Sequence, residues 1–127
     1  MNYQEAIKGY TGVIQAYALA ARTADKLGED IVVLDLRRQS PLSEYFVVAS
    51  AGSTVHAQAI ADEVVSDLKR EGQPVHHLEG TEHGLWILLD YFDVVVHIFS
   101  GDVRQFYGLE RLWGDAPRRT FAETDDS

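Results

Sequence analysis

Apolar residues in the first part of the chain recur at spacings of three and four, which is the pattern of a helix with one buried face. The positions on that face are Ile7, Tyr10, Ile14, Tyr17, Ala21 and Ala24. Gly9 and Gly12 weaken the first turns, because glycine has a low helix propensity. The pattern therefore predicts an N-terminal helix that ends at residues 27–28, where a glycine is typical of a helix end.

Two short segments that follow are β-branched and almost wholly apolar. Residues 30–36 (DIVVLDL) and 44–50 (EYFVVAS) have the length and composition of strands that are covered on both faces. Between them lies a polar segment with Pro41, which has no backbone N–H to offer to a β-ladder. This segment is therefore a predicted loop between two strands.

Helical spacing returns after the turn at residues 52–53. The apolar side of this second predicted helix consists of Ala57, Ile60, Ala61, Val64 and Leu68. Gly72 is its expected end, and residues 74–80 (PVHHLEG) form a predicted strand. Residues 84–100 contain two apolar runs that are separated by residues 90–93 (DYFD), which indicates a tight hairpin.

Residues 101–112 form the last predicted helix, with Ser100 as its N-cap. The order helix, two strands, helix, three strands, helix predicts an α/β fold, in which a mixed β-sheet of about five strands is flanked by helices. A chain of 127 residues has the usual size of a single domain. The end of the chain is polar and acidic, and we expect it to be disordered.

Composition limits the classes of protein that fit this chain. It has no run of about 18 apolar residues and starts without a secretory signal, so we expect a soluble, cytoplasmic protein. The absence of cysteine excludes disulfides and thiolate sites. The net charge of −9 opposes binding to phosphate backbones. We therefore expect a basic protein partner and little direct contact with nucleic acid.

The histidines and serines form no recognisable catalytic or metal-binding motif. His76 and His77 are adjacent, so their side chains would point to opposite faces of a strand. No serine lies in a G-x-S-x-G segment, and His97 lies within an apolar run, which is typical of a core histidine. We therefore expect no metal, no cofactor and no catalytic residue.

Two polar features leave an enzymatic alternative open. Backbone N–H groups at Gly52 could hold a phosphate, although Ser53 at this strand-to-helix turn is also typical of a helix cap. Asp35, Asp90 and Asp93 lie at expected strand ends and could hold Mg²⁺ for nucleotidyl transfer. The Asp-x-Asp pair that such sites usually contain is missing, and aspartate is common in turns. The cap and the turn are therefore the favoured interpretations.

Trp86 is a large aromatic residue within an alternating segment. Alternation places Trp86 and Leu88 on one face of the expected strand. The opposite face carries Leu85, Ile87 and Leu89. If both faces are covered, Trp86 is a core residue, and if its face is open, it is a typical anchor for a protein partner.

Seven segments along the chain together carry a resemblance to a known family. In order, they are DIVVLDL, EYFVVAS, QAIADEV, LEG, WILLD, DVVVHIF and FYGLERLWGDAP. Together they resemble the ribosomal silencing factor family, RsfS, which is also called Iojap-like. The resemblance divides the chain into an N-terminal helical extension (residues 1–23), an RsfS-like domain (24–117) and an acidic disordered tail (118–127).

The resemblance implies a nucleotidyltransferase-like topology without that activity. It also implies a translational repressor that binds the large ribosomal subunit through its ribosomal protein numbered fourteen and sterically blocks association with the small subunit. Members of the family often form homodimers, so a homodimer is a further expectation. The alternative is a nucleotidyltransferase-like enzyme that binds or transfers nucleotides, with residues 52–53 at the phosphate and Asp35 with Asp90 or Asp93 at magnesium.

Six residues make up the predicted partner-binding surface: Trp86, Leu88, Asp90, Tyr107, Leu109 and Glu110. The resemblance implies that Trp86 is the leading contact residue, followed by Tyr107 and Leu109. Asp90 and Glu110 are included on charge alone, because a basic partner would pair with them.

Leu112 and Trp113 precede two residues that end helices, Gly114 and Pro117. A tryptophan can bury about 150–250 Å² of surface. We therefore expect Leu112 and Trp113 to pack the end of the last helix onto the sheet, rather than to form a sticky surface.

Overall fold

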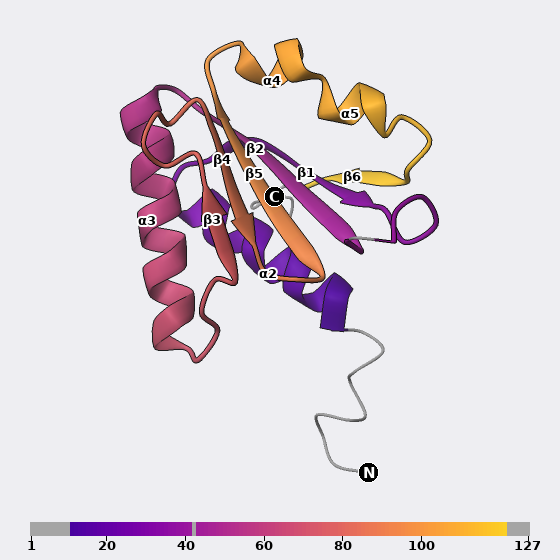
Figure 1. Cartoon of the computed structure of the whole chain (residues 1–127), viewed down its shortest axis with the longest axis horizontal. Helices are drawn as coiled ribbons and strands as arrows, with labels where there is room; N and C mark the ends of the chain where they lie inside the picture. Colours follow the sequence, from indigo (N-terminus) through magenta and orange to yellow (C-terminus); the bar gives the residue numbers. More distant parts are fainter. Residues whose placement is uncertain (1–10, 42, 122–127) are drawn as a thin grey trace, which may run out of the picture.

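A mixed six-stranded sheet forms the centre of the computed structural model, which describes residues 11–41 and 43–121 (Figure 1). The strands are β1 (Glu29–Asp35), β2 (Tyr45–Ala51), β3 (His77–Glu79), β4 (Trp86–Asp90), β5 (Val94–Ser100) and β6 (Arg118–Thr120). Their order is β3-β4-β5-β2-β1-β6, in which β2 and β5 are parallel and the other neighbours are antiparallel. The predicted α/β fold with a mixed sheet is confirmed, with six strands rather than about five.

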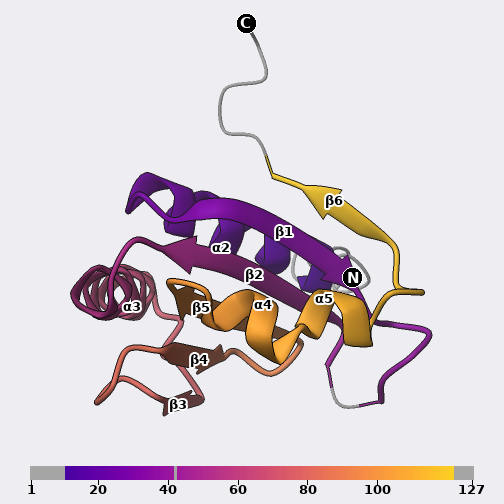
Figure 2. The ribbon, with the colours of Figure 1, turned by 90° about the horizontal axis from the view of Figure 1, so that it is seen from above.

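Helices cover both faces of this sheet (Figures 1 and 2). The long helices α2 (Thr11–Asp25) and α3 (Thr54–Arg70) pack on one face, where their buried side chains join Val33, Val47 and Ile98 in one core cluster. The short helices α4 (Val103–Tyr107) and α5 (Leu109–Leu112) lie on the other face, over a smaller group of buried residues that includes Val48 and Phe99 and that we call the second core cluster. Every residue of β5 is buried, because this strand is central and covered on both sides. None of the described helices has the length and apolar character needed to cross a membrane.

The buried face of α2 differs from the predicted one. Its buried residues are Ala16, Leu19, Ala20 and Thr23, whereas the predicted Ala21 and Ala24 are only half-buried. The side chains of the other predicted positions, Ile7, Tyr10, Ile14 and Tyr17, lie outside the described part of the structure. The helix is rich in alanine, so more than one stripe is apolar, and packing against the sheet selects between them. Thr23 is tolerated in this face because its hydroxyl donates to the carbonyl of Leu19 at 2.8 Å.

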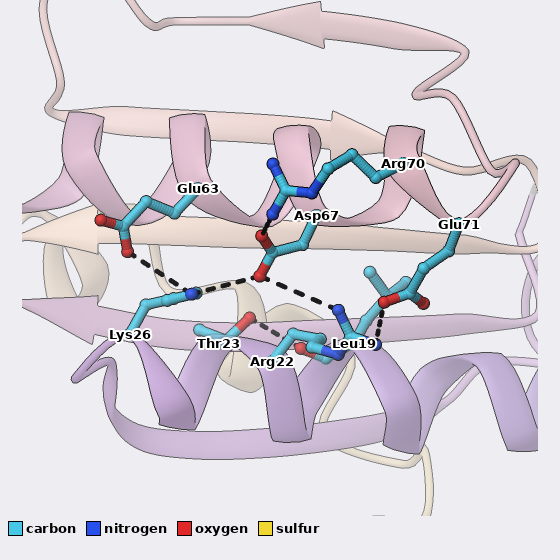
Figure 3. A network of polar contacts seen from close by, with 8 residues as sticks. All are labelled: Leu19, Arg22, Thr23, Lys26, Glu63, Asp67, Arg70 and Glu71. Carbon is cyan, nitrogen blue, oxygen red and sulfur yellow. Dashed lines mark hydrogen bonds and ion pairs between the residues drawn. The ribbon is translucent and has the colours of Figure 1, made fainter.

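Ion pairs connect α2 to α3 along their exposed sides (Figure 3). The carboxylate of Asp67 on α3 lies 3.1 Å from the Lys26 ammonium and 3.8 Å from the Arg22 guanidinium of α2. The remaining members of this network are Glu63 and Arg70 on α3 and Glu71, the C-cap residue of α3. The hydrogen bond from Lys26 lowers the pKa of Asp67, so this carboxylate is ionised at pH 7 and adds an electrostatic contact to the shared core of the two helices.

Two parts of the C-terminal region differ from the expectations. The predicted helix over residues 101–112 is divided into α4 and α5 by Gly108, which adopts a left-handed conformation with φ of 62°. Ser100 is not the N-cap; it ends β5 and its hydroxyl donates to the carbonyl of Gly84 at 2.9 Å. Asp102 takes the N-cap position of α4.

Residues 118–120 form β6, although we expected a disordered tail over residues 118–127. This strand pairs with the free edge of β1, with Arg118 opposite Leu34 and Arg119 opposite Val33. Its three side chains are exposed and polar, so no apolar alternation marks it in the sequence. Residues 122–127 lie outside the described part of the chain.

Candidate partner-binding surface

Trp86 is half-buried on the sheet face that α4 and α5 partly cover. Its indole N–H donates to Nδ1 of His97 on β5 at 3.0 Å. The ring centroid lies 5.1 Å from that of Phe99 and 4.6 Å from that of Tyr107 on α4. Trp86 therefore combines the two roles that the sequence left open, because it packs against the second core cluster and still presents part of its ring to solvent.

His97 holds Trp86 in this orientation. Its side chain is only 3% exposed, and burial lowers its pKa to about 4, so the imidazole is neutral at pH 7. Because Nδ1 accepts the indole hydrogen bond, the ring proton lies on Nε2, which has no hydrogen-bond partner among the described residues. The prediction of a core histidine is confirmed, but only one of its two nitrogens is satisfied.

Exposed aromatic side chains on α4 extend the surface around Trp86. Tyr107 is 51% exposed and Phe106 is 80% exposed, with their rings 5.3 Å apart. Leu88 is half-buried and lies opposite His97 in the β4–β5 register, on the same face as Trp86. We call Trp86, Leu88, Phe106 and Tyr107 the aromatic surface.

Phe106 was missing from the sequence-based site. The sequence alone gave no decisive signal for it, because neighbouring positions of a helix can both face the core, as Ile60 and Ala61 of α3 do. In the structure Gly108 ends α4 after Tyr107, and this short helix buries none of its residues. The structure thus adds Phe106 to the side chains that it brings together around Trp86.

Three other predicted residues occupy different settings. Leu109 packs partly buried against the second core cluster. Glu110 accepts hydrogen bonds from the Arg104 guanidinium at 2.7 and 3.2 Å, so its charge is already paired within the chain. Asp90 lies four residues from Trp86 along β4, about 13 Å away, and accepts the backbone N–H of Phe92 at 2.8 Å. Glu110 is therefore already paired with an arginine, and Asp90 lies too far along β4 to belong to the aromatic surface.

The end of α5 is partly as predicted. Trp113 is half-buried against the second core cluster, with its ring 6.3 Å from Phe46 in an edge-on arrangement. Leu112 is 71% exposed, so its predicted packing onto the sheet is wrong. The break at Gly108 redirects α5 so that Trp113 rather than Leu112 faces the sheet.

The residues required by the enzymatic alternative lie at opposite ends of β2. Asp35 pairs with Tyr45 at the start of β2, and the carbonyl of Asp93 accepts the N–H of Tyr45 at the same end. Gly52 and Ser53 follow the other end, a strand length of about 20 Å away. Ser53 caps α3, with its hydroxyl accepting the N–H of His56 at 3.0 Å. The predicted helix cap is confirmed, and the structure brings no pair of these carboxylates to the turn at Gly52.

Known proteins resemble this chain along most of its length. A family model described as "Ribosomal silencing factor during starvation" matches residues 12–127. The protein named "Ribosomal silencing factor RsfS" of Bacillus subtilis (strain 168) is 43% identical over 98 residues, which cover 77% of this chain and 83% of that protein. The protein "Mitochondrial assembly of ribosomal large subunit protein 1" of Mus musculus is 31% identical over 87 residues, covering 66% of this chain and 38% of that protein.

The fold is also similar to a solved structure. A crystal structure of a protein from Chromobacterium violaceum superposes with a TM-score of 0.74 at 37% sequence identity, and covers 79% of this chain and 84% of that chain. The resemblance carried by the seven sequence segments is confirmed by these matches, and the family match extends beyond residues 24–117 at both ends.

Proposed function

Because this chain belongs to the ribosomal silencing factor (RsfS) family, we propose that it represses translation in the cytoplasm by binding the large ribosomal subunit and blocking its association with the small one. The name of the Bacillus subtilis relative supports silencing, and the name of the mouse relative supports an association with the large subunit. The contact on the large subunit is its ribosomal protein numbered fourteen.

The aromatic surface is the observation that carries this proposal. Partner-binding hot spots are enriched in tryptophan and tyrosine that are rigid before binding. Trp86 is held by the hydrogen bond to His97 and by Phe99, while Phe106 and Tyr107 leave a large apolar area exposed beside it. A protein partner would cover the Trp86 ring with little loss of side-chain entropy, because that ring is already fixed.

The mechanism is occupancy of space. A bound domain of 14.2 kDa on the interface side of the large subunit takes the volume that the small subunit must enter. Side chains of the aromatic surface are required to hold the domain in place, and no bond is made or broken. We also propose that catalysis plays no part, and that the chain forms a homodimer when it is not on the ribosome.

A subunit-joining assay tests the function directly. Purified large subunits are incubated with the full chain, small subunits are added, and the mixture is sedimented through a sucrose gradient. We expect the chain to sediment with large subunits and not with small ones, and the joined ribosome peak to decrease as the chain is titrated. A chain that saturates the large subunit without reducing joining would contradict the occupancy mechanism. Sedimentation of the free chain at several concentrations tests the homodimer.

A further inference from the structure

Positive charge is concentrated at one side of this acidic protein. Residues 35–40 and 104–119 contain six of the eleven Lys and Arg residues but only three of the twenty Asp and Glu residues. These segments are the end of β1 with the loop after it, α4, α5 and the start of β6. In Figure 1 α5 and β6 lie near the end of β1, whereas α4 lies farther away, and Arg104 at its start donates to Ser50 near the other end of β2. The net charge of −9 is therefore made by the rest of the chain.

Four arginines surround two adjoining hollows at the β1–β6 edge of the sheet. The first hollow, of about 440 Å³, is lined by Arg37 and Arg38. The second, of about 190 Å³, is lined by Arg37, Arg118 and Arg119, and the two hollows also share Asp35 and Pro117. We call Arg37, Arg38, Arg118 and Arg119 the basic edge.

Only part of this positive charge is neutralised within the chain. Arg37 donates to both oxygens of Asp35, at 2.9 and 2.7 Å, and lies 5.4 Å from the centre of the Tyr45 ring. This pairing lowers the pKa of Asp35 and fixes the Arg37 guanidinium in place. Arg118 approaches the already paired Glu110. The side chains of Arg38 and Arg119 are exposed, and neither guanidinium makes an ion pair or a hydrogen bond with a described residue, although the charge of Arg38 also lowers the pKa of Asp35.

Unpaired arginines on a sheet edge have the chemistry of a phosphate-binding surface. A guanidinium binds phosphate oxygens through several N–H groups and is weakly hydrated, so it gives up water readily. Charges spread along an edge match a chain of phosphates better than they match one compact anion. The acidic remainder of the molecule would repel the same chain elsewhere and restrict contact to this edge.

We propose that the basic edge binds the phosphate backbone of ribosomal RNA while the aromatic surface holds a ribosomal protein, which revises the expectation from the net charge of little direct contact with nucleic acid. This inference rests on the proposed function, because it takes the large subunit as the binding site. Helices α4 and α5 connect the two surfaces, because Tyr107 is the last residue of α4 and the chain continues from α5 to Arg118 at the start of β6. A target that presents protein and RNA side by side would contact both.

Charge-matched variants test the RNA contact. Arg38→Gln with Arg119→Gln removes the two unpaired arginines, and Lys8→Gln with Lys69→Gln removes the same charge from positions outside the basic edge. Affinity of the full chain for large subunits is measured between about 50 and 300 mM KCl, with thermal melts to verify folding. We expect the first variant to bind more weakly at low salt and to reduce the slope of log Kd against log salt by about two. The control should keep the wild-type slope.

Crosslinking identifies what the basic edge touches. The chain contains no cysteine, so Gln39→Cys beside Arg38 supplies a single site for a benzophenone label without removing an arginine. After irradiation on large subunits, a crosslink that ribonuclease digests supports the proposal. A crosslink to protein only would overturn the proposal. It would also be overturned if the bound chain gave no crosslink and the two charge variants had equal salt slopes. Failure of the wild-type chain to bind large subunits would instead contradict the proposed function.

Discussion

Trp86 and His97 act as one unit, because each is the hydrogen-bond partner of the other across β4 and β5. The indole N–H needs an acceptor, and a neutral imidazole supplies it inside the second core cluster. Protonation of His97 would place a charge in that cluster and would convert the acceptor nitrogen into a donor. The orientation of the leading contact residue therefore depends on a buried base that is neutral above its pKa.

This buried base predicts a loss of stability in mild acid. His97 has a pKa of about 4 in the folded chain, below its ordinary value of about 6.5, so the unfolded chain binds the proton more tightly. The free energy of unfolding should decrease as the pH falls from about 6.5 to about 4, by about 3 kcal/mol in total. Urea unfolding at a series of pH values measures this change.

The matched variants for this prediction are His97→Gln and His83→Gln. Glutamine at position 97 offers an oxygen to the Trp86 indole but does not titrate, so the pH dependence between about 4 and 6.5 should become flatter. His83 is exposed, and its replacement should leave the wild-type dependence intact. Equal slopes in all three proteins would show that His97 is not the responsible group.

Substitution of Tyr107 in the aromatic surface should weaken binding much more than it weakens folding. Its side chain is half exposed, so Tyr107→Ala should change the free energy of unfolding by no more than about 1 kcal/mol. Affinity for large subunits should fall by about thirtyfold, the change that corresponds to about 2 kcal/mol for a hot spot. Phe92→Ala is the control, because Phe92 is 64% exposed in the β4–β5 turn, away from this surface. Wild-type affinity of Tyr107→Ala would place the partner on another face.

Trp86→Ala should affect both quantities. The ring is half-buried, so we expect a loss of about 2 kcal/mol of stability, less than the 3 to 5 kcal/mol typical of a fully buried aromatic residue. The variant also removes the leading contact, and binding should weaken at least as much as in Tyr107→Ala. Thermal melts and titrations against large subunits measure the two effects, and a stable variant with unchanged affinity would refute the role of Trp86.

At the scale of helices and strands, short-range packing at α5 distinguishes two neighbouring apolar residues. Trp113→Ala should reduce the free energy of unfolding by about 2 kcal/mol, because the half-buried ring packs against Phe46. Leu112→Ala should change it by no more than about 0.5 kcal/mol, because Leu112 is exposed. Chemical denaturation of both variants checks the order, which would be reversed if α5 were rotated by about 100°.

Ion pairs between α2 and α3 give the second prediction at this scale. Asp67→Asn removes the carboxylate that Lys26 and Arg22 share, so the melting temperature should fall by a few degrees in low salt. Salt screens exposed charges, and the difference from the wild type should shrink at about 0.5 M NaCl. Asp62→Asn on the exposed side of α3 is the control. A loss that persists undiminished in high salt would mean that Asp67 acts through packing.

At the scale of the whole molecule, the two core clusters share one sheet and should unfold together. Both tryptophans contact the second core cluster, under α4 and α5, so their fluorescence reports on that face of the sheet. Most of the helical residues described belong to α2 and α3 on the other face, so circular dichroism reports mainly on that face. Tryptophan fluorescence and far-ultraviolet circular dichroism should therefore give coincident urea transitions. A fluorescence transition at lower urea would show that the α4 and α5 face opens independently.

The pattern of the sequence was sufficient for the elements that bury long apolar runs. Strands β1, β2 and β5 and the apolar side of α3 were predictable, because burial on one or both faces requires apolar residues at a fixed period. The helix cap at Ser53 was predictable for a local reason, since its hydroxyl bonds to an N–H only three residues away. The family was predictable as well, because seven segments kept both their residues and their order.

Only the tertiary structure decided the features that depend on contacts between distant residues. β6 exists because β1 offers a free edge, and Phe106 and Leu112 are exposed because Gly108 divides the last helix. Trp86 is neither core nor open surface, since α4 covers part of its ring. The net charge does not say where the charges lie, whereas the fold brings Arg37 and Arg38 close to Arg118 and Arg119 at the β1–β6 edge. Sequence periodicity reports local burial, and these features arise from packing between segments that are far apart along the chain.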